Sequence, residues 1–267
     1  MKPQEFFAKR PVFTYDEFVA ALDTEDRTKR TRDTLLAYYV KTGRLVHVRR
    51  GLYVTVPAGT DPAGCPLDPY LLAAKLTDDA VLAYHTALEF HGKAHSVLEH
   101  FVYLTARRSR ALAFRGQHFR AVPFPKVLRE KDRATVGAKT AERQGVTVRV
   151  TTLERTLVDL LDRPDLGGGW EEIWRSLESV EFFDLDRVVE YALLLANATT
   201  AAKVGFYLQS HRDTLKVSED HLKRLQVHRP KEPHYLERST RKPGRLAADW
   251  NLVVPVEILE RSWEEPS

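Results

Sequence analysis

Cysteine is almost absent from this sequence, which holds a single one, Cys65, in 267 residues. One thiol cannot close an internal disulfide and is too few for a thiolate metal site, which fits a reducing cytoplasm. Long apolar runs are also missing, because stretches such as YALLLANA at 191–198 fall well short of the roughly 20 residues that cross a bilayer. The opening MKPQEFFAKR lacks the apolar core of a signal peptide. We therefore expect a cytoplasmic protein without redox chemistry or membrane contact.

The composition is otherwise that of an ordinary globular protein, with 43% hydrophobic and 29% charged residues. A chain of 267 residues exceeds a typical single domain, so two domains are expected. The proline- and glycine-rich cluster PAGTDPAGCP at 57–66 has no periodic apolar pattern and marks a boundary. We predict a first domain at 1–58, a linker at 59–66 and a larger second domain at 67–267.

Positive charge is concentrated in one segment, RTKRTRDTLLAYYVKTGRLVHVRRGLYV at 27–54. The segment holds eight Lys and Arg side chains and a single acid, Asp33, so its net charge is +7. The whole chain is +4, and everything outside the segment therefore sums to −3. Charge gathered in this way, instead of being spread as a solubilising coat, indicates an acidic partner.

Two helices are expected in this region. The first, YDEFVAAL at 15–22, is amphipathic and opens with a capping box between Thr14 and Glu17. The second spans about 28–42 and ends at Gly43, because glycine adopts the left-handed conformation that terminates helices.

A β-hairpin is expected directly after the second helix. Residues 45–56 alternate between apolar and polar side chains and are interrupted at Arg49-Arg50-Gly51, which predicts a tight turn. Helix, helix and two-stranded ribbon is the order of a winged helix-turn-helix. The residues between 23 and 27 leave room for one short turn, so the recognition helix is assigned from its polarity and charge.

The rest of the chain mixes helices and strands. Helices are expected at 80–91, 151–163 and within 170–212, and strands at 100–105, 118–124, 145–151 and within 248–259. Thr151 and Glu154 fit a capping box at the start of the second of these helices. The fold class is therefore α+β, with an N-terminal winged helix-turn-helix and a larger mixed α/β C-terminal domain.

The basic helix has the polarity of a DNA-reading element. Short hydrogen-bonding and cationic side chains crowd its first turns, whereas aliphatic and aromatic residues gather later, as a helix in the major groove requires. The hairpin turn offers two further arginines that could reach a neighbouring phosphate or minor groove. A solvated face is the alternative, but such a face normally mixes both signs. The predicted DNA-binding residues are Thr28, Lys29, Arg30, Thr31, Arg32, Arg49 and Arg50.

Two more basic stretches lie at 107–133 and 223–245. Either could extend the DNA footprint or meet an RNA or nucleotide, and a solvated surface explains each equally well. We interpret the first as a secondary DNA contact. Its candidate residues are Arg107, Arg108, Arg110 and Arg115.

Catalytic and metal-binding patterns are weak. His85, His91 and His95 do not share one helix face, so packing or polar contacts explain them better than a metal does. Glu154, Arg155 and Asp159 are spaced for a helix cap and an intrahelical pair. A nuclease is a distant third interpretation, because the nearest pattern, Asp249 followed by Glu257-Ile258-Leu259, has leucine where a Glu-x-Lys pair needs lysine. We expect no enzymatic activity, no metal and no cofactor.

Four motifs in order carry a resemblance that spans nearly the full length. They are GRLVHVRRGLYV, AYHTALEFHGKAHS, VRVTTLERTLVDLLDRPDLGGGWEEIW and WNLVVPVEIL. With them the chain resembles the AbiEi antitoxins, the transcriptional-regulator halves of abortive-infection toxin–antitoxin systems of type IV. Matched residue by residue, the resemblance implies a DNA-contacting role for Lys29, Arg30, Arg32, Arg49 and Arg50. No short motif carries the antitoxin residues over.

The resemblance implies a bacterial autorepressor that binds operator DNA at repeats in its own promoter. Its second domain would neutralise a nucleotidyltransferase-type toxin encoded alongside, without requiring a stable complex, as part of phage defence. The alternative is a stand-alone winged-helix repressor whose second domain senses a ligand or makes a dimer. A toxin gene directly downstream would favour the antitoxin hypothesis over the stand-alone repressor.

Overall fold

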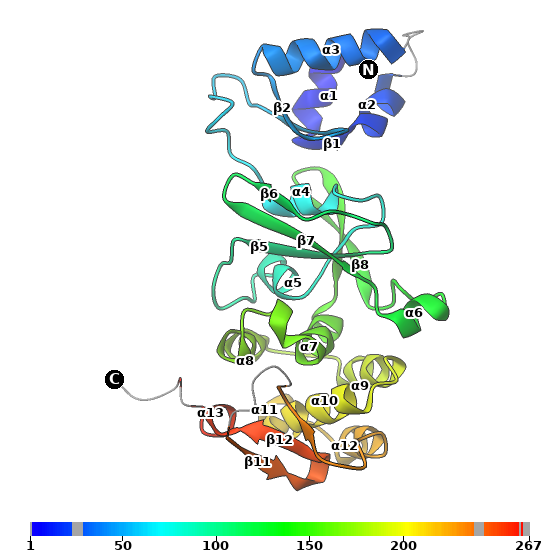
Figure 1. Ribbon diagram of the computed structural model, residues 1–267, viewed down its shortest axis with the longest axis vertical. Helices are drawn as coiled ribbons and strands as arrows, with labels where there is room; N and C mark the ends of the chain where they lie inside the picture. The colour runs from blue at the N-terminus through cyan, green and yellow to red at the C-terminus, as the bar shows by residue number, and fades with distance from the viewer. Residues whose placement is uncertain (1, 23–28, 238–242, 262, 264–267) are drawn as a thin grey trace. The chain divides into compact units, whose positions relative to one another are not determined.

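The computed structural model describes residues 2–22, 29–237, 243–261 and 263, and its fold is mixed α+β with several sheets (Figure 1). The chain forms two compact units. The first unit comprises Met1–Leu82, Glu99–Ala121 and Thr140–Arg149, and the second comprises Ala83–Leu98, Val122–Lys139 and Val150–Ser267. Within the described residues, no helix combines the length and the apolar character needed to cross a bilayer.

The N-terminal part of the first unit places three helices against a small antiparallel sheet with strand order β1-β3-β2 (Figure 1). Its elements are α1 (Pro3–Lys9), β1 (Val12–Thr14), α2 (Tyr15–Leu22), α3 (Lys29–Lys41), β2 (Leu45–Arg49) and β3 (Leu52–Thr55). The rings of Phe6, Phe7, Phe13 and Phe18 pack within about 6 Å of one another and form the core with Leu36 and Tyr39.

Local signals set the ends of these elements as the sequence predicts. The Thr14 N–H donates to the Glu17 carboxylate at 2.9 Å, and the Glu17 N–H donates to the Thr14 hydroxyl at 3.2 Å, which confirms the capping box. After α3, Gly43 has φ +71° and the Arg44 N–H donates to the Tyr39 carbonyl at 2.9 Å. This is the left-handed termination that was expected. Gly51, at φ +74°, turns the hairpin between β2 and β3.

A six-stranded sheet with order β6-β7-β5-β4-β9-β8 belongs mainly to the first unit, and the ends of three strands run into the second. The strands are β4 (Val81–Leu82), β5 (His100–Thr105), β6 (Leu112–Phe114), β7 (Gln117–Pro123), β8 (Ala138–Arg143) and β9 (Val146–Thr151). Helix α4 (Pro69–Ala74) precedes them and is capped by Asp68. Residues 56–68, all of them described, contain no helix or strand.

The second unit is mostly helical and carries a small sheet with order β10-β12-β11. Its helices are α5 (His85–Phe90), α6 (Lys126–Glu130), α7 (Leu153–Asp162), α8 (Trp170–Glu178), α9 (Leu185–Leu194), α10 (Ala198–Ser210), α11 (Arg212–Leu215), α12 (Glu219–Gln226) and α13 (Val256–Leu259). Its strands and short helical turns are η1 (Pro164–Leu166), β10 (His234–Tyr235), β11 (Gly244–Ala247), η2 (Ala248–Trp250) and β12 (Leu252–Pro255). Gly205 lets α10 approach Trp250, because an added Cβ would lie 2.0 Å from the indole ring.

Three expectations for this part of the chain are corrected. Thr152, not Thr151, caps α7, and its hydroxyl accepts from the Arg155 N–H. The Glu154 carboxylate accepts from the Asp184 N–H at 3.4 Å instead of closing a capping box. The helix expected at 80–91 is a strand at Val81–Leu82 followed by the shorter helix α5.

Candidate nucleic-acid interface

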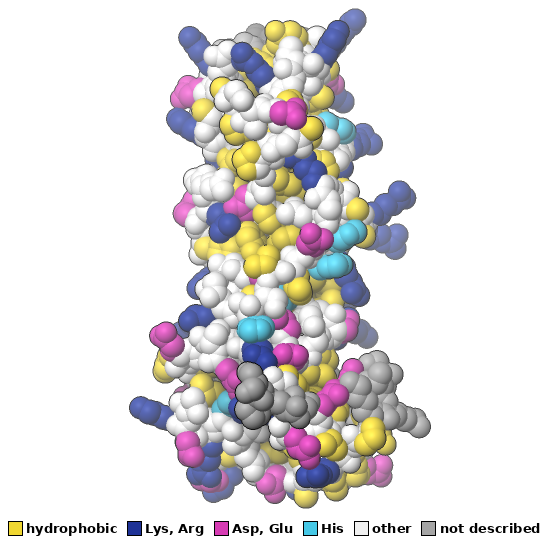
Figure 2. Space-filling model, turned by 90° about the vertical axis from the view of Figure 1, so that its left-hand side faces the viewer, with side chains coloured by type: hydrophobic (Ala, Val, Ile, Leu, Met, Phe, Trp, Pro, Cys, Tyr) yellow, Lys and Arg dark blue, Asp and Glu magenta, His cyan; other side chains and the backbone are white. Residues whose placement is uncertain are grey.

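Helix α3 has one buried side and one exposed side. Leu36 and Tyr39 are buried in the aromatic core, with 2% and 8% of their surface exposed. Because a helix has about 3.6 residues per turn, residues that are three, four or seven positions apart lie together on the side opposite to Leu36 and Tyr39. That side consists of Arg30, Thr34, Ala37, Tyr38 and Lys41, all exposed. We call this set the outer face of α3; Figure 2 shows Lys and Arg side chains projecting over this helix.

Three of the predicted residues in α3, Lys29, Arg30 and Thr31, are exposed in its first turn. Arg32 is different, because it is half-buried on the side of the helix that faces the core. It lies near the Tyr15 hydroxyl, whose pKa is raised chiefly by the neighbouring Asp33 carboxylate, while Arg32 opposes that change. Arg32 therefore belongs to the inner side of α3. Thr28 lies outside the described residues.

The two hairpin arginines also separate. Arg50 is exposed in the turn between β2 and β3. Arg49 is half-buried, and its guanidinium donates to the Leu76 carbonyl and, at 3.5 Å, to the Ser109 hydroxyl. Because both acceptors are neutral, no carboxylate offsets the positive charge of Arg49 in these bonds. The N–H groups of its guanidinium are nevertheless directed at the protein. Arg50 is the hairpin cation available to a ligand.

The arginines of the basic stretch at 107–133 divide in the same way, into two that bond to the protein and two that are exposed. Arg107 forms a two-bond pair with Asp78, at 3.1 and 3.0 Å, and this pair lowers the pKa of Asp78. Arg115 donates to the carbonyls of Cys65, at 2.6 Å, and Pro62. Arg108 and Arg110 are exposed, and no hydrogen bond or ion pair of theirs is found within the described part of the chain.

Sequence reasoning missed part of the outer face of α3. It counted charges, left Lys41 out of the predicted DNA-binding residues and did not consider Tyr38, which is 57% exposed. A large aromatic side chain exposed on a helix surrounded by cations is unusual for a merely solvated face. The spacing i, i+4, i+7, i+8, i+11 from Arg30 was the available signal, since these positions share one side of a helix.

The predicted histidine contacts lie in the second unit and are structural. His85 is 1% exposed and lies between Glu89, at 3.0 Å, and Glu172, at 2.9 Å. Burial alone would lower the pKa of His85, but contacts with the two carboxylates outweigh it and raise that pKa. The His91 ring contacts the Thr151 carbonyl at 2.8 Å. No cluster of three possible metal ligands occurs among the residues that the structure describes.

A second buried network confirms the intrahelical pair predicted in α7. The Arg155 guanidinium donates to Asp159 at 3.1 Å and to the carbonyls of Ala134 and Val136 at 2.9 and 2.6 Å. The Tyr191 hydroxyl donates to the other oxygen of Asp159 at 2.8 Å. The network joins α7, α9 and the segment before β8, which is a packing role.

The chain is thus a mixed α+β protein in which a cationic helix face and hairpin turn stand out in the first unit. Its fold is similar to that of the RV2827C protein from Mycobacterium tuberculosis, with a TM-score of 0.63 and 18% identity, over 98% of this chain and 93% of that chain. At this identity the likeness bears on the fold alone. No family model matches the chain, and no curated protein matches it.

Proposed function

We propose that residues 1–58 form a winged helix-turn-helix that binds double-stranded DNA, with α3 in the major groove and the β2–β3 hairpin as the wing. The observation that carries the proposal is the outer face of α3, which joins cationic, hydroxyl and aromatic side chains opposite a buried core side. Side chains of these types contact phosphates and base edges. The order of helices and the three-stranded sheet support the same assignment.

Roles follow from exposure. Lys29, Arg30 and Thr31 begin the reading helix, and Arg50 contacts a phosphate beside the groove. Arg32 and Arg49 hold α3 and the hairpin in place, because Arg32 is half-buried beside Tyr15 and the Arg49 guanidinium donates to the protein. Arg108 and Arg110 make the secondary contact, and Arg107 and Arg115, which already bond to the protein, do not.

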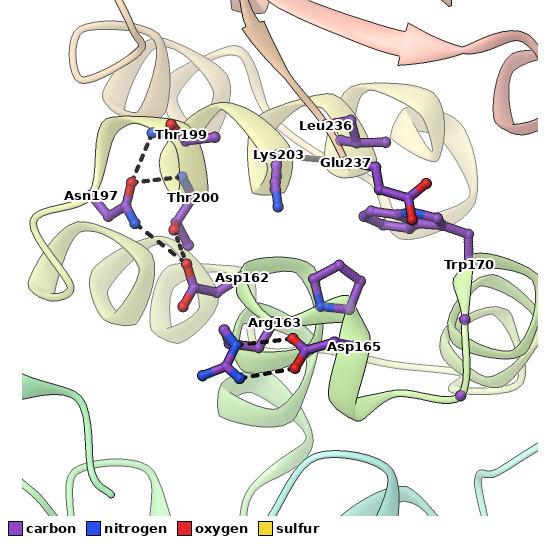
Figure 3. A pocket seen from close by; sticks show the side chains of 13 residues that line it. Asp162, Arg163, Asp165, Trp170, Asn197, Thr199, Thr200, Lys203, Leu236 and Glu237 are labelled. Carbon is purple, nitrogen blue, oxygen red and sulfur yellow. Dashed lines mark hydrogen bonds and ion pairs between the residues drawn. The ribbon is translucent and has the colours of Figure 1, made fainter. Parts of the chain in front are cut away.

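We propose further that the chain is a cytoplasmic antitoxin that represses its own operon and neutralises a nucleotidyltransferase-type toxin, with no catalysis of its own. This step rests on the four motifs that resemble the AbiEi family, since no antitoxin residue can be assigned. The stand-alone repressor with a ligand-sensing second domain is the alternative. A cavity in the second unit, lined by polar side chains such as Asp162 and by the Trp170 ring, favours that alternative as a place for a ligand (Figure 3).

A gel shift tests the DNA proposal. The full chain is titrated onto the duplex directly upstream of its own gene and onto a shuffled duplex of the same composition. We expect the upstream duplex to shift at a much lower protein concentration, since specific sites exceed non-specific ones by roughly a thousandfold or more. Equal affinity for both duplexes, or no shift of either, would reject an operator-binding role.

Co-expression tests the antitoxin proposal. The full chain and the neighbouring open reading frame are placed under separate inducible promoters, so that repression by the chain plays no part. We expect the chain to restore growth, and the double variant Arg30→Ala, Arg50→Ala to restore it equally well, because DNA contacts are not needed. Growth arrest that the chain does not relieve would favour the stand-alone repressor.

A further inference from the structure

Two exposed histidines lie side by side on the six-stranded sheet, where β6, β7 and β5 are neighbours (Figure 1). Successive side chains of a strand point to opposite faces of its sheet. On one face, Phe101 of β5 and Phe119 of β7 are buried, and their rings stack with centres 5.4 Å apart. The residues one position earlier, His100 and His118, lie on the opposite face, and both are exposed. The alternation of side chains therefore places two imidazole rings on a surface that meets solvent.

The two imidazole rings are stacked, with centres 5.1 Å apart and planes inclined by 18°. Strand β7 lies between β5 and β6, so His100 occupies one side of the His118 ring only. On the other side, Ala113 of β6 is directly opposite His118 in the strand register. Ala113 is exposed, and its methyl group is too short to cover an imidazole. One face of the His118 ring is therefore available to another planar ring.

The position above Ala113 suits an unpaired nucleobase. Stacked aromatic rings have centres about 4.5–7 Å apart, and neighbouring strands are about 4.8 Å apart, so a base above Ala113 would continue the stack by one ring. Histidine is one of the side chains on which proteins stack unpaired bases. In a duplex each base already has neighbours on both faces. The position therefore fits a single strand and not a duplex.

Arg120 offers a contact for the phosphate of the same nucleotide. It follows His118 on the same face of the sheet, two residues and about 7 Å along β7. Arg120 is exposed, and no hydrogen bond or ion pair of its side chain is found in the part of the chain that the structure describes. Its guanidinium group carries a planar fork of donors that matches a phosphate. The sugar of a nucleotide spans the distance from a base on His118 to a phosphate on Arg120.

The charge of the surrounding segment favours a polyanion. Residues 99–121 hold five arginines, no lysine and one acid, Glu99, so the net charge of the segment is +4. Arg107 pairs with Asp78, and no ion pair of the other four arginines is found among the described residues. A face that only keeps a protein soluble normally mixes both signs of charge. The segment therefore complements a strand of phosphates.

Glu99 indicates which kind of strand fits. Its carbonyl accepts the His118 N–H at 2.8 Å, so Glu99 adjoins the two stacked rings, and its side chain is exposed. A carboxylate in this place repels a phosphate but accepts a hydrogen bond from a hydroxyl group. RNA carries such a donor, the 2′-hydroxyl group, and DNA does not.

We propose that this face of β5, β6 and β7 binds single-stranded RNA, with a base stacked on His118 and a phosphate on Arg120. The RNA site goes beyond the proposed binding of operator DNA and does not depend on it, because no residue of the outer face of α3 takes part.

Fluorescence anisotropy of the full chain tests the proposal with three labelled ligands. They are a short RNA of mixed sequence that cannot pair with itself, the DNA strand of the same sequence, and the DNA duplex formed from that strand. We expect the RNA to bind about fivefold or more tightly than the duplex, because stacking of one base on an aromatic side chain changes affinity by about that factor. No binding of RNA, equal binding of RNA and duplex, or a DNA strand that binds as tightly as the RNA would overturn the proposal.

Substitutions of His118 test the stacked base. His118→Ala should weaken RNA binding about fivefold or more, whereas His118→Phe keeps a ring for stacking and should bind nearly as the wild type does. Equal RNA affinity of the wild type and a folded His118→Ala protein would overturn the proposal. The three ligands on the wild type decide the question even if a variant does not fold.

Substitutions of arginine test the phosphate contact and separate the two surfaces. Arg120→Ala should weaken RNA binding and make its salt dependence shallower, while Arg187→Ala, at an exposed arginine of α9, is the matched control and should change neither. Equal behaviour of these two variants would contradict the role of Arg120. The double variant Arg30→Ala, Arg50→Ala, which should lose operator DNA, should still prefer RNA to an unrelated duplex, so failure of one proposal does not conceal failure of the other.

Discussion

Individual side chains of α3 have different roles although they are close in sequence. Arg30 belongs to the outer face, and Arg32, two residues later, lies half-buried on the inner side. We predict that Arg30→Ala weakens DNA binding by about tenfold or more, since a lost arginine contact costs about 1–3 kcal/mol, and leaves thermal stability unchanged. Arg32→Ala should instead lower the melting temperature. Fluorescence anisotropy with a labelled duplex and a thermal melt of each variant separate the two effects.

The same change in DNA affinity and in melting temperature for both variants would contradict these roles. If Arg32→Ala reduced DNA affinity as much as Arg30→Ala without any loss of stability, the two sides of α3 would be wrongly assigned. Arg187→Ala is the control, because Arg187 is an exposed helical cation of the second unit that pairs with Asp184 and lies outside the basic stretches.

The buried His85 pair makes a prediction about pH. Burial alone would raise the pKa of Glu172, but hydrogen bonds from Ser96, His85 and Ser176 outweigh it and lower that pKa to about 2. Its stabilising contribution is present above the ordinary value of 4.5 and is lost as pH falls toward 2. The pKa of His85 is raised, so its contribution is full below the ordinary value of 6.5 and is lost as pH rises through the raised value.

The test is urea unfolding across a pH series for the wild type and for His85→Gln. We expect the substitution to cost about 3 kcal/mol near pH 6, because it leaves two buried carboxylates without their cation. The difference between the two proteins should shrink as pH rises above the folded pKa of His85. A difference that stayed constant over the whole series would contradict a change in the charge of His85 within that pH range.

Among the elements, those defined by local signals were predictable. The capping box of α2, the end of α3 at Gly43 and the hairpin turn at Gly51 depend on residues within a few positions, and all three are present. The cap of α7 was placed one residue early, because Thr151 and Thr152 have the same chemistry and only the backbone decides between them. Strand β4 was missed because two residues become a strand only by pairing with their neighbours β5 and β9.

The candidate interface was predictable as a segment and not residue by residue. Charge counting found α3 and the hairpin, but Arg49 bonds to residues 27 and 60 positions away, which no local pattern reveals. The same holds for Arg115 and its partner Cys65, 50 positions away. A basic helix can be predicted from the sequence, because its residues are close together in the chain. Tertiary contacts decide which of the arginines faces solvent.

The hairpin provides a test at the level of an element. Gly51 has φ +74°, which alanine adopts at a cost of about 1–2 kcal/mol and asparagine tolerates better. We predict that Gly51→Ala lowers the free energy of unfolding by about that amount and weakens DNA binding through Arg50, while Gly51→Asn does so less. Chemical denaturation and anisotropy check both statements. Equal effects of the two substitutions would show that the conformation of Gly51 is not what the hairpin requires.

For the whole molecule, the central fact is an uneven distribution of charge. The segment 27–54 carries +7 in a chain of +4, and its exposed cations among the described residues lie on α3, at Arg44 just after it, and in the hairpin turn. A protein that binds DNA through such a surface displaces counterions, so its affinity falls as salt rises. The slope of log affinity against log salt concentration is proportional to the number of phosphate contacts.

The most direct test of the account is therefore a salt series of DNA affinity for the wild type, Arg187→Ala and the double variant Arg30→Ala, Arg50→Ala. Each lost phosphate contact should make the slope of log affinity against log salt shallower by about 0.9. The account predicts that the double variant binds more weakly and with a shallower slope, whereas Arg187→Ala matches the wild type. Identical slopes and affinities for all three proteins would contradict it.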